Sequence, residues 1–237
     1  MSDLVVRGVS KAFGDLVVLS GLSIRVPEHR ITSVLGPSGC GKTTLLNVIA
    51  GTVAPDSGCV EGMGGAGVSY LFQEPRLLPW KSVSGNVDFV LRDRMTAAER
   101  KEAVGSVLAL VGLHEFRASR PAQLSGGMKQ RAAMARAFAY PSEVLLMDEP
   151  FRALDLPLKL ALMRAFVALW ERDRRTVLFV THDIQEALFL GDDILVLSPR
   201  PATVRDHVAN PITRQERSFQ SPAMLALERD LYALLLR

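Results

Sequence analysis

The sequence predicts an α/β fold that combines a mostly parallel sheet with an N-terminal antiparallel β lobe and an inserted α-helical lobe. Three observations lead to this prediction. Residues 4–26 alternate like strands joined by a turn at 13–15, and residues 83 to about 136 repeat apolar side chains at helical spacing. The third is a series of short apolar runs of strand length, the later ones separated by helical patterns: 30–35, 68–72, 143–147, 176–180 and 193–197. Strands that alternate with helices form a mostly parallel sheet covered on both faces.

Length and composition describe a folded globular protein. Of 237 residues, 48% are hydrophobic and 22% are charged, which provides enough apolar content for a sizeable core. We expect a single domain over 1–237, with the helical lobe at about 83–136 and a C-terminal helical extension at about 205–237. The net charge of +3 favours an ordinary solvated surface over one selected for an anionic membrane or nucleotide. No run of lysine or arginine predicts nucleic-acid binding.

The strand at 30–35 leads into a phosphate-binding loop that fits the pattern G-x-x-x-x-G-K-[ST], and a helix at 44–50 follows. Glycines in this pattern let backbone N–H groups surround the β- and γ-phosphates, while Lys42 adds a positive charge and Thr43 is a ligand for Mg²⁺. The residues expected to bind nucleotide here are Gly36, Pro37, Ser38, Gly39, Cys40, Gly41, Lys42, Thr43 and Thr44. A glycine-rich turn with no nucleotide role would not explain the flanking strand and helix. The sequence therefore predicts a phosphate-loop NTPase core.

A second nucleotide motif follows the apolar strand at 144–147, which delivers Asp148 and Glu149 at its C-terminal end. Ligands of α/β sheets bind at such strand ends. Asp148 suits Mg²⁺ binding, directly or through water, and Glu149 suits polarising the attacking water. An Asp-Glu-Pro turn that only caps the strand is the alternative, and the phosphate loop favours the nucleotide role.

The cysteines and the N-terminus indicate a reducing compartment. Cys40 and Cys59 form neither a disulfide framework nor a metal-binding C-x-x-C pair. The first residues read as a strand and not as a signal peptide. No apolar run approaches the ~18 residues needed to span a bilayer. If the protein moves a solute across a membrane, another chain must supply the path.

The run LSGGMKQR at 124–131 resembles the signature of ATP-binding cassette proteins, and the resemblance covers nearly the whole chain in the family's order. Ser125 and the N–H groups of Gly126 and Gly127 open a helix that continues to about 139, which makes a second anion site. The resemblance implies ATP as the nucleotide. It also implies a homodimer closing over two ATP molecules, with Lys42 of one chain facing Ser125 of the other.

Four further positions match this family. Gln73 resembles the glutamine that senses the γ-phosphate and Mg²⁺, and His182 resembles the switch histidine that contacts the γ-phosphate and orients Glu149. Phe13 resembles the aromatic residue that stacks on adenine, although core filling between the early strands is an alternative for it. The run 151–155 resembles the D-loop, which makes Asp155 a nucleotide-site residue.

The sequence departs from the family pattern in two places. Arg152 stands in the D-loop where the family usually carries a small residue, and it could reach phosphate, a partner carboxylate or solvent. The segment 58–67 looks shorter than the usual β lobe, so its hairpins are expected to be abbreviated. Because the phosphate loop and Glu149 are kept, we still expect hydrolysis.

The run 71–80 resembles importers for nitrate, aliphatic sulfonates, taurine and related small solutes, as does Ser198-Pro199-Arg200-Pro201. In that family the surface after Gln73 receives a short helix of the membrane subunit. Leu77, Leu78 and Trp80 would form part of this surface, or pack inside the helical lobe, or both. A helix at about 223–236 is expected to pack on the core.

The resemblance identifies the chain as the ATPase subunit of a bacterial-type importer, peripheral on the cytoplasmic face of the inner membrane. It implies a dimer that works with integral membrane permease subunits and, indirectly, with a periplasmic or extracellular solute-binding protein. One alternative is a soluble cassette ATPase of DNA repair or translation, which usually carries a coiled-coil insertion or two cassettes. The other is a regulatory subunit that binds nucleotide without hydrolysing it.

Overall fold

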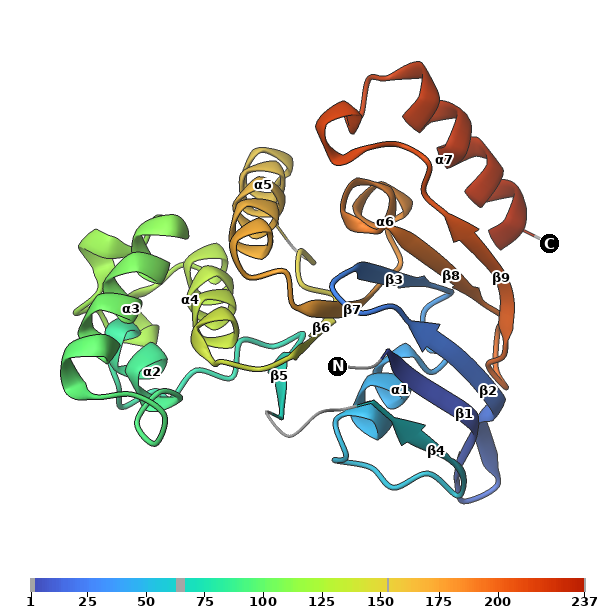
Figure 1. Ribbon diagram of the computed structural model, residues 1–237, viewed down its shortest axis with the longest axis horizontal. Helices are drawn as coiled ribbons and strands as arrows, with labels where there is room; N and C mark the ends of the chain where they lie inside the picture. The colour runs from blue at the N-terminus through green and yellow to red at the C-terminus, as the bar shows by residue number, and fades with distance from the viewer. Residues whose placement is uncertain (1–2, 63–66, 153, 237) are drawn as a thin grey trace.

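The computed structural model describes residues 3–62, 67–152 and 154–236, which form two sheets (Figure 1). The antiparallel sheet has the order β2-β1-β4 and contains β1 (Leu4–Phe13), β2 (Leu16–Val26) and β4 (Ser57–Glu61). The larger sheet has the order β5-β6-β7-β3-β8-β9 and contains β3 (Ile31–Leu35), β5 (Val68–Leu71), β6 (Val144–Asp148), β7 (Thr176–Thr181), β8 (Asp193–Leu197) and β9 (Val204–Ala209). The predicted combination of a β lobe and a larger sheet is confirmed.

Neighbouring strands of the larger sheet run parallel, except that β9 pairs antiparallel with β8 at the edge. Every residue of β3, β6, β7 and β8 is buried, as expected for parallel strands covered on both faces. Alternate side chains of β6 enter different cores, because successive residues of a strand point to opposite faces. Leu145 and Met147 pack against the helices, whereas Val144 and Leu146 pack with the small sheet and α1 (Lys42–Ile49).

Three helices between β5 and β6 form the helical part of the chain, with α2 and α3 at one end of the molecule and α4 next to the sheet (Figure 1). The apolar face predicted from helical spacing is confirmed, since Val87, Leu91, Val104 and Leu108 are all buried in one cluster. The elements of this region are α2 (Val83–Phe89), α3 (Ala97–Leu110), η1 (His114–Phe116), η2 (Pro121–Gln123) and α4 (Gly126–Ala139).

The remaining helices come from the carboxyl half of the chain and cover the larger sheet. They are α5 (Leu156–Asp173), α6 (Ile184–Leu190), η3 (Arg214–Glu216) and α7 (Pro222–Leu235). Met224 and Leu231 of α7 pack in one cluster with Ile184 and Leu188 of α6, so the expected C-terminal helix exists and packs on the core. Within 3–62, 67–152 and 154–236, no helix combines the length and the apolar character that crossing a membrane requires.

The structure differs from the sequence prediction at the start of the region 205–237, where a C-terminal helical extension was expected. Residues 204–209 form β9, whose side chains alternate between half-buried and exposed. An edge strand with one face in solvent carries a weak apolar signal, and this explains the error.

The segment 58–67 is described only in part, because residues 63–66 lie outside the described residues. Its first part belongs to β4, which pairs with β1. Gly58 has φ +81°, and a Cβ there would lie 2.3 Å from the carbonyl oxygen of Arg7. Glycine is therefore required for the close approach of these two strands.

Candidate nucleotide-binding site

Parallel pairing brings three strand ends to one edge of the larger sheet. Leu35 at the end of β3 pairs with Thr181 of β7, and Asp148 at the end of β6 pairs with Val180. The phosphate loop follows β3, Glu149 follows β6 and His182 follows β7. Side chains separated by more than a hundred residues in sequence are thereby placed side by side at this edge.

A cleft of about 350 Å³ opens at this edge. It joins the β lobe to the phosphate loop and to the acidic end of β6. Its lining residues are Phe13, Val18, Ser38, Gly39, Gly41, Lys42, Thr43, Thr44, Gln73, Glu149, Arg152 and Arg200. Phe13 is 51% exposed, so it lies at the cleft and is not core filling between the strands. Most of the residues predicted to bind nucleotide thus line one cleft of a single chain.

The phosphate loop curves around the ammonium group of Lys42. This group donates to the carbonyl oxygens of Gly36 at 2.7 Å and Pro37 at 3.0 Å. Gly41 has φ +122°, and a Cβ there would lie 2.8 Å from Val18 Cγ1, so only glycine fits. Cys40 is buried in the core, and burial raises the pKa of its thiol. Cys40 therefore serves packing, while Gly39, Gly41 and Lys42 line the cleft.

Thr43 and Gln73 also line an adjoining cleft of about 280 Å³ that contains Asp148. Asp148 is buried, which raises the pKa of its carboxyl group, while a hydrogen bond from the Thr43 hydroxyl acts in the opposite direction. A hydroxyl, a side-chain amide and a carboxylate supply hard oxygen ligands of the kind that Mg²⁺ takes. These residues fit a Mg²⁺ ion held between protein and phosphate.

Glu149 lies at the centre of a small polar group beside the phosphate loop. Its Oε1 is 3.3 Å from Nδ1 of His182, so the two residues meet as the sequence predicted. Its Oε2 accepts a hydrogen bond from Arg152 Nη1 at 3.1 Å. From the sequence we expected Arg152 to contact phosphate, a partner carboxylate or solvent. Its contact in the structure is instead a carboxylate of its own chain. The i, i+3 spacing within a turn was the signal that could have indicated this contact.

The signature residues and Asp155 do not line this cleft. Ser125 caps α4 by accepting from the Met128 N–H at 3.3 Å, and Asp155 caps α5 by accepting from the Leu158 N–H at 2.9 Å. Gly126 and Gly127 form the first turn of α4. These groups lie at helix N-termini, where N–H groups attract anions, and they are available to a second molecule.

Arg200 is a cleft residue that the sequence did not assign to the nucleotide. It follows β8 in a loop tied to β2, where the Ala202 N–H donates to Val18 at 2.8 Å and the Ser20 N–H donates to Ala202 at 3.2 Å. Its Nη2 would lie 3.8 Å from a Cβ on Gly39. The motif Ser198-Pro199-Arg200-Pro201 was visible in the sequence, but its position beside Gly39 depends on a long-range pairing.

An ionic network around the buried Glu186 supports the segment that carries His182. Lys159 of α5 lies 2.6 Å from Oε1 of Glu186 and also pairs with Asp183, the N-cap of α6. The Thr181 hydroxyl donates to Oε2 of Glu186 at 2.6 Å. Burial raises the pKa of Glu186, while the nearby Lys159 acts in the opposite direction. Lys159 thereby ties the first turn of α5 to the loop around His182.

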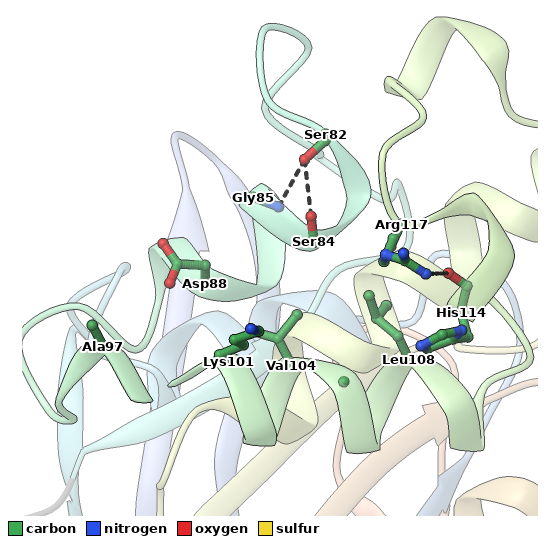
Figure 2. Close-up of a pocket in the computed structure, with 11 residues that line it drawn as sticks. Ser82, Ser84, Gly85, Asp88, Ala97, Lys101, Val104, Leu108, His114 and Arg117 are labelled. Atoms are coloured by element: carbon green, nitrogen blue, oxygen red, sulfur yellow. Dashed lines mark hydrogen bonds between the residues drawn. The ribbon is translucent and has the colours of Figure 1, made fainter. Parts of the chain in front are cut away.

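A larger cleft of about 600 Å³ lies in the helical part, between α2, α3 and the segment 114–117 (Figure 2). Its lining side chains include Lys101, His114 and Arg117, whereas Asp88 pairs with Arg92 and Arg100. We call this cleft the helical groove. The residues that precede the groove in the sequence differ in burial. Leu77 is half-buried against the core, whereas Trp80 is 68% exposed.

Comparisons with known proteins agree with this geometry. The family model described as ABC transporter matches residues 19–152. The taurine import ATP-binding protein TauB of Chromobacterium violaceum is 42% identical over 223 residues, covering 91% of this chain and 85% of that protein. The aliphatic sulfonates import ATP-binding protein SsuB 2 of Burkholderia cenocepacia is 40% identical over 230 residues, covering 94% and 83%.

Two solved structures are similar to the whole arrangement. A dimeric bacterial ABC transporter cassette has a TM-score of 0.79 and 29% identity, covering 89% of this chain and 100% of the other. A dimeric post-hydrolysis state of an ATP-binding cassette, bound to ADP and phosphate, has a TM-score of 0.77 and 28% identity with the same coverage. The predicted α/β class, with its β lobe and inserted helices, is confirmed.

Substituting Lys159 by Met should leave Glu186 buried without its cation and lower the free energy of unfolding at neutral pH by about 3–5 kcal/mol. Because the folded-state pKa of Glu186 is raised, its contribution to stability is complete below its ordinary pKa and is lost as the pH rises through the raised value. Without Lys159, which lowers the pKa of Glu186, this pKa should rise further, so the deficit of the variant should shrink as the pH falls. Urea denaturation between pH 5 and pH 8 measures this.

The double variant Lys159→Met with Glu186→Gln is the control, because it has no carboxyl group at position 186 to titrate. Its deficit relative to the wild type should vary less with pH than that of the single variant. An identical deficit for Lys159→Met at every pH would contradict this account of the network.

Proposed function

The chain belongs to the ABC transporter family, and we propose that it powers an importer for nitrate, a sulfonate, taurine or a related small solute. Its family makes it an ATP-binding protein and an ATPase. The observation that carries the proposal is the meeting of Lys42, Glu149 and His182 at one sheet edge. The solute class is inferred from relatives that are named as taurine and aliphatic sulfonate import proteins.

The cleft is suited to transfer of the terminal phosphoryl group of ATP to water. Lys42 and the N–H groups at the start of α1 would bind the phosphate oxygens, and Phe13 would stack on the adenine at the other end of the cleft. Thr43, Asp148 and Gln73 would hold Mg²⁺, which neutralises charge on the phosphates when it is bound. Phosphoryl transfer depends mainly on such positioning and electrostatic stabilisation.

Glu149 is the group that would act on water. Its side chain is only 11% exposed and lies at the cleft, while His182 contacts its Oε1 and orients it. From this position Glu149 would polarise the attacking water and accept its proton. Lys42 and the loop N–H groups would stabilise the charge that develops on the transferred phosphoryl group.

A second copy of the chain would complete each site. Ser125, Gly126, Gly127 and Asp155 are absent from the lining of the cleft in their own chain. Ser125 and Asp155 cap α4 and α5, and Gly126 and Gly127 form the first turn of α4. The proposal places these residues against ATP held by the partner protomer. Two similar cassettes of known structure are dimeric, which supports this arrangement.

The importer also requires membrane subunits, and we place their contact at the helical groove. Trp80 is exposed two residues before Ser82, which lines the groove. Lys101, His114 and Arg117 give the groove a basic lining, and Asp88 is already paired with Arg100. Charge complementarity therefore favours a short helix of the membrane subunit that carries acidic side chains. The protein would then work on the cytoplasmic side of the membrane, with a solute-binding protein outside. A soluble cassette ATPase would need no such contact.

Hydrolysis is tested with two variants of the isolated protein. Glu149→Gln should bind Mg-ATP but lose more than about 99% of turnover, because the amide accepts no proton from water. Lys42→Ala should weaken ATP binding itself, since it removes the cation at the phosphates. Phosphate release and equilibrium binding measure the two effects. Normal turnover by Glu149→Gln would contradict the proposed mechanism, and a wild type without turnover would support the regulatory alternative.

Docking at the helical groove is tested on the importer purified with its membrane subunits. Trp80→Ala and Lys101→Glu should reduce recovery of the complex several-fold while leaving ATP hydrolysis by the isolated protein unchanged. Tyr232→Ala is the matched control, because it removes an exposed aromatic side chain that lies on α7 and away from the groove lining. It should leave the complex intact. Full recovery of the complex with both Trp80→Ala and Lys101→Glu would exclude this groove as the contact.

A further inference from the structure

Both carboxylate oxygens of Glu149 are engaged in this structure. Oε1 lies 3.3 Å from Nδ1 of His182, and Oε2 lies 3.1 Å from Nη1 of Arg152. A carboxylate that receives a proton from water must present an oxygen to that water. The pair with Arg152 therefore occupies the remaining oxygen of the group proposed to act on water.

The backbone of residues 149–152 is fixed, so the side chain of Arg152 is the part free to move. Glu149 adopts φ +44°, and the Arg152 N–H donates to the Glu149 carbonyl at 3.2 Å. The Pro150 carbonyl accepts from Gln130 at 2.9 Å, and Phe151 is buried against Phe166. In contrast to this anchored turn, the Arg152 side chain is 55% exposed.

A half-exposed ion pair is weak and yields to a stronger competing anion. Arg152 lines the same cleft as Lys42 and Thr43, where the phosphates would lie. The terminal phosphate of ATP carries more charge than a carboxylate. It also offers several oxygens, which match the planar guanidinium fork. ADP lacks the γ-phosphate, so this competing anion is absent when ADP is bound.

We propose that Arg152 is a positioning residue that holds Glu149 Oε2 until the terminal phosphate of a nucleoside triphosphate draws the guanidinium away. Binding of the triphosphate thus frees the carboxylate for water, and loss of the terminal phosphate restores the pair. The site is thereby kept inactive unless it holds its substrate. This inference rests on the proposed role of Glu149 in hydrolysis.

The first test compares affinities for ADP and for the non-hydrolysable analogue adenylyl imidodiphosphate, both with Mg²⁺. Arg152→Gln should lower affinity for the analogue roughly tenfold and leave ADP affinity within about twofold, because only the triphosphate receives the guanidinium. Arg152→Lys, which keeps the charge, should recover part of the difference. Arg205→Gln removes an exposed arginine from β9, outside the cleft lining, and should change neither affinity.

The second test is a double-mutant cycle of Arg152→Gln and Glu149→Gln, read as the thermal unfolding midpoint. The two residues should be coupled by about 1–3 °C without nucleotide and with ADP, and uncoupled with adenylyl imidodiphosphate. A purely structural contact would give the same coupling in all three states.

Equal losses of analogue and ADP affinity, no loss at all, or coupling that persists with the analogue would overturn the inference. Failure of the proposed function has a different signature. In that case Glu149→Gln continues to hydrolyse ATP, whatever the affinities of the Arg152 variants.

Discussion

The parallel pairing of β3, β6 and β7 is the constraint on which the rest of the structure depends. Their register aligns three strand ends, and each end continues directly into a part of the proposed site: the phosphate loop, Glu149 and His182. Each of these strands is buried along its whole length, so a shift in register would expose or misplace an entire apolar segment. The position of the site thus derives first from the packing of the sheet.

Around this fixed edge, charge is distributed so that the cleft can hold polyanionic nucleotide. Lys42, Arg152 and Arg200 line it together with one acidic residue, Glu149. Each cation comes from a different part of the chain, and only Lys42 is buried. Exposed cations attract a phosphate chain without fixing it, whereas the buried one is held in the curve of the loop. Behind them, the Lys159 network fixes the His182 segment to α5.

Much of this architecture could be predicted from sequence, for reasons that differ between elements. Fully buried strands such as β6 and β7 are continuous apolar runs, and the phosphate loop has a pattern that few other structures need. β9 was missed because one of its faces is in solvent. The contact of Arg152 with Glu149 depends on an unusual backbone angle, and the place of Arg200 depends on pairing between distant segments. Local patterns indicate the first contact only through its i, i+3 spacing, and they do not encode the second.

The central claim is that the cleft is half of a site, which a second copy completes with Ser125. Its most direct test is the molar mass of Glu149→Gln in solution by light scattering, with and without Mg-ATP, because this variant should hold ATP without consuming it. The account predicts a monomer that becomes a dimer with Mg-ATP, and no dimer when Ser125 is also replaced by Arg. A Glu149→Gln protein that is saturated with Mg-ATP and remains monomeric at micromolar concentration would contradict it.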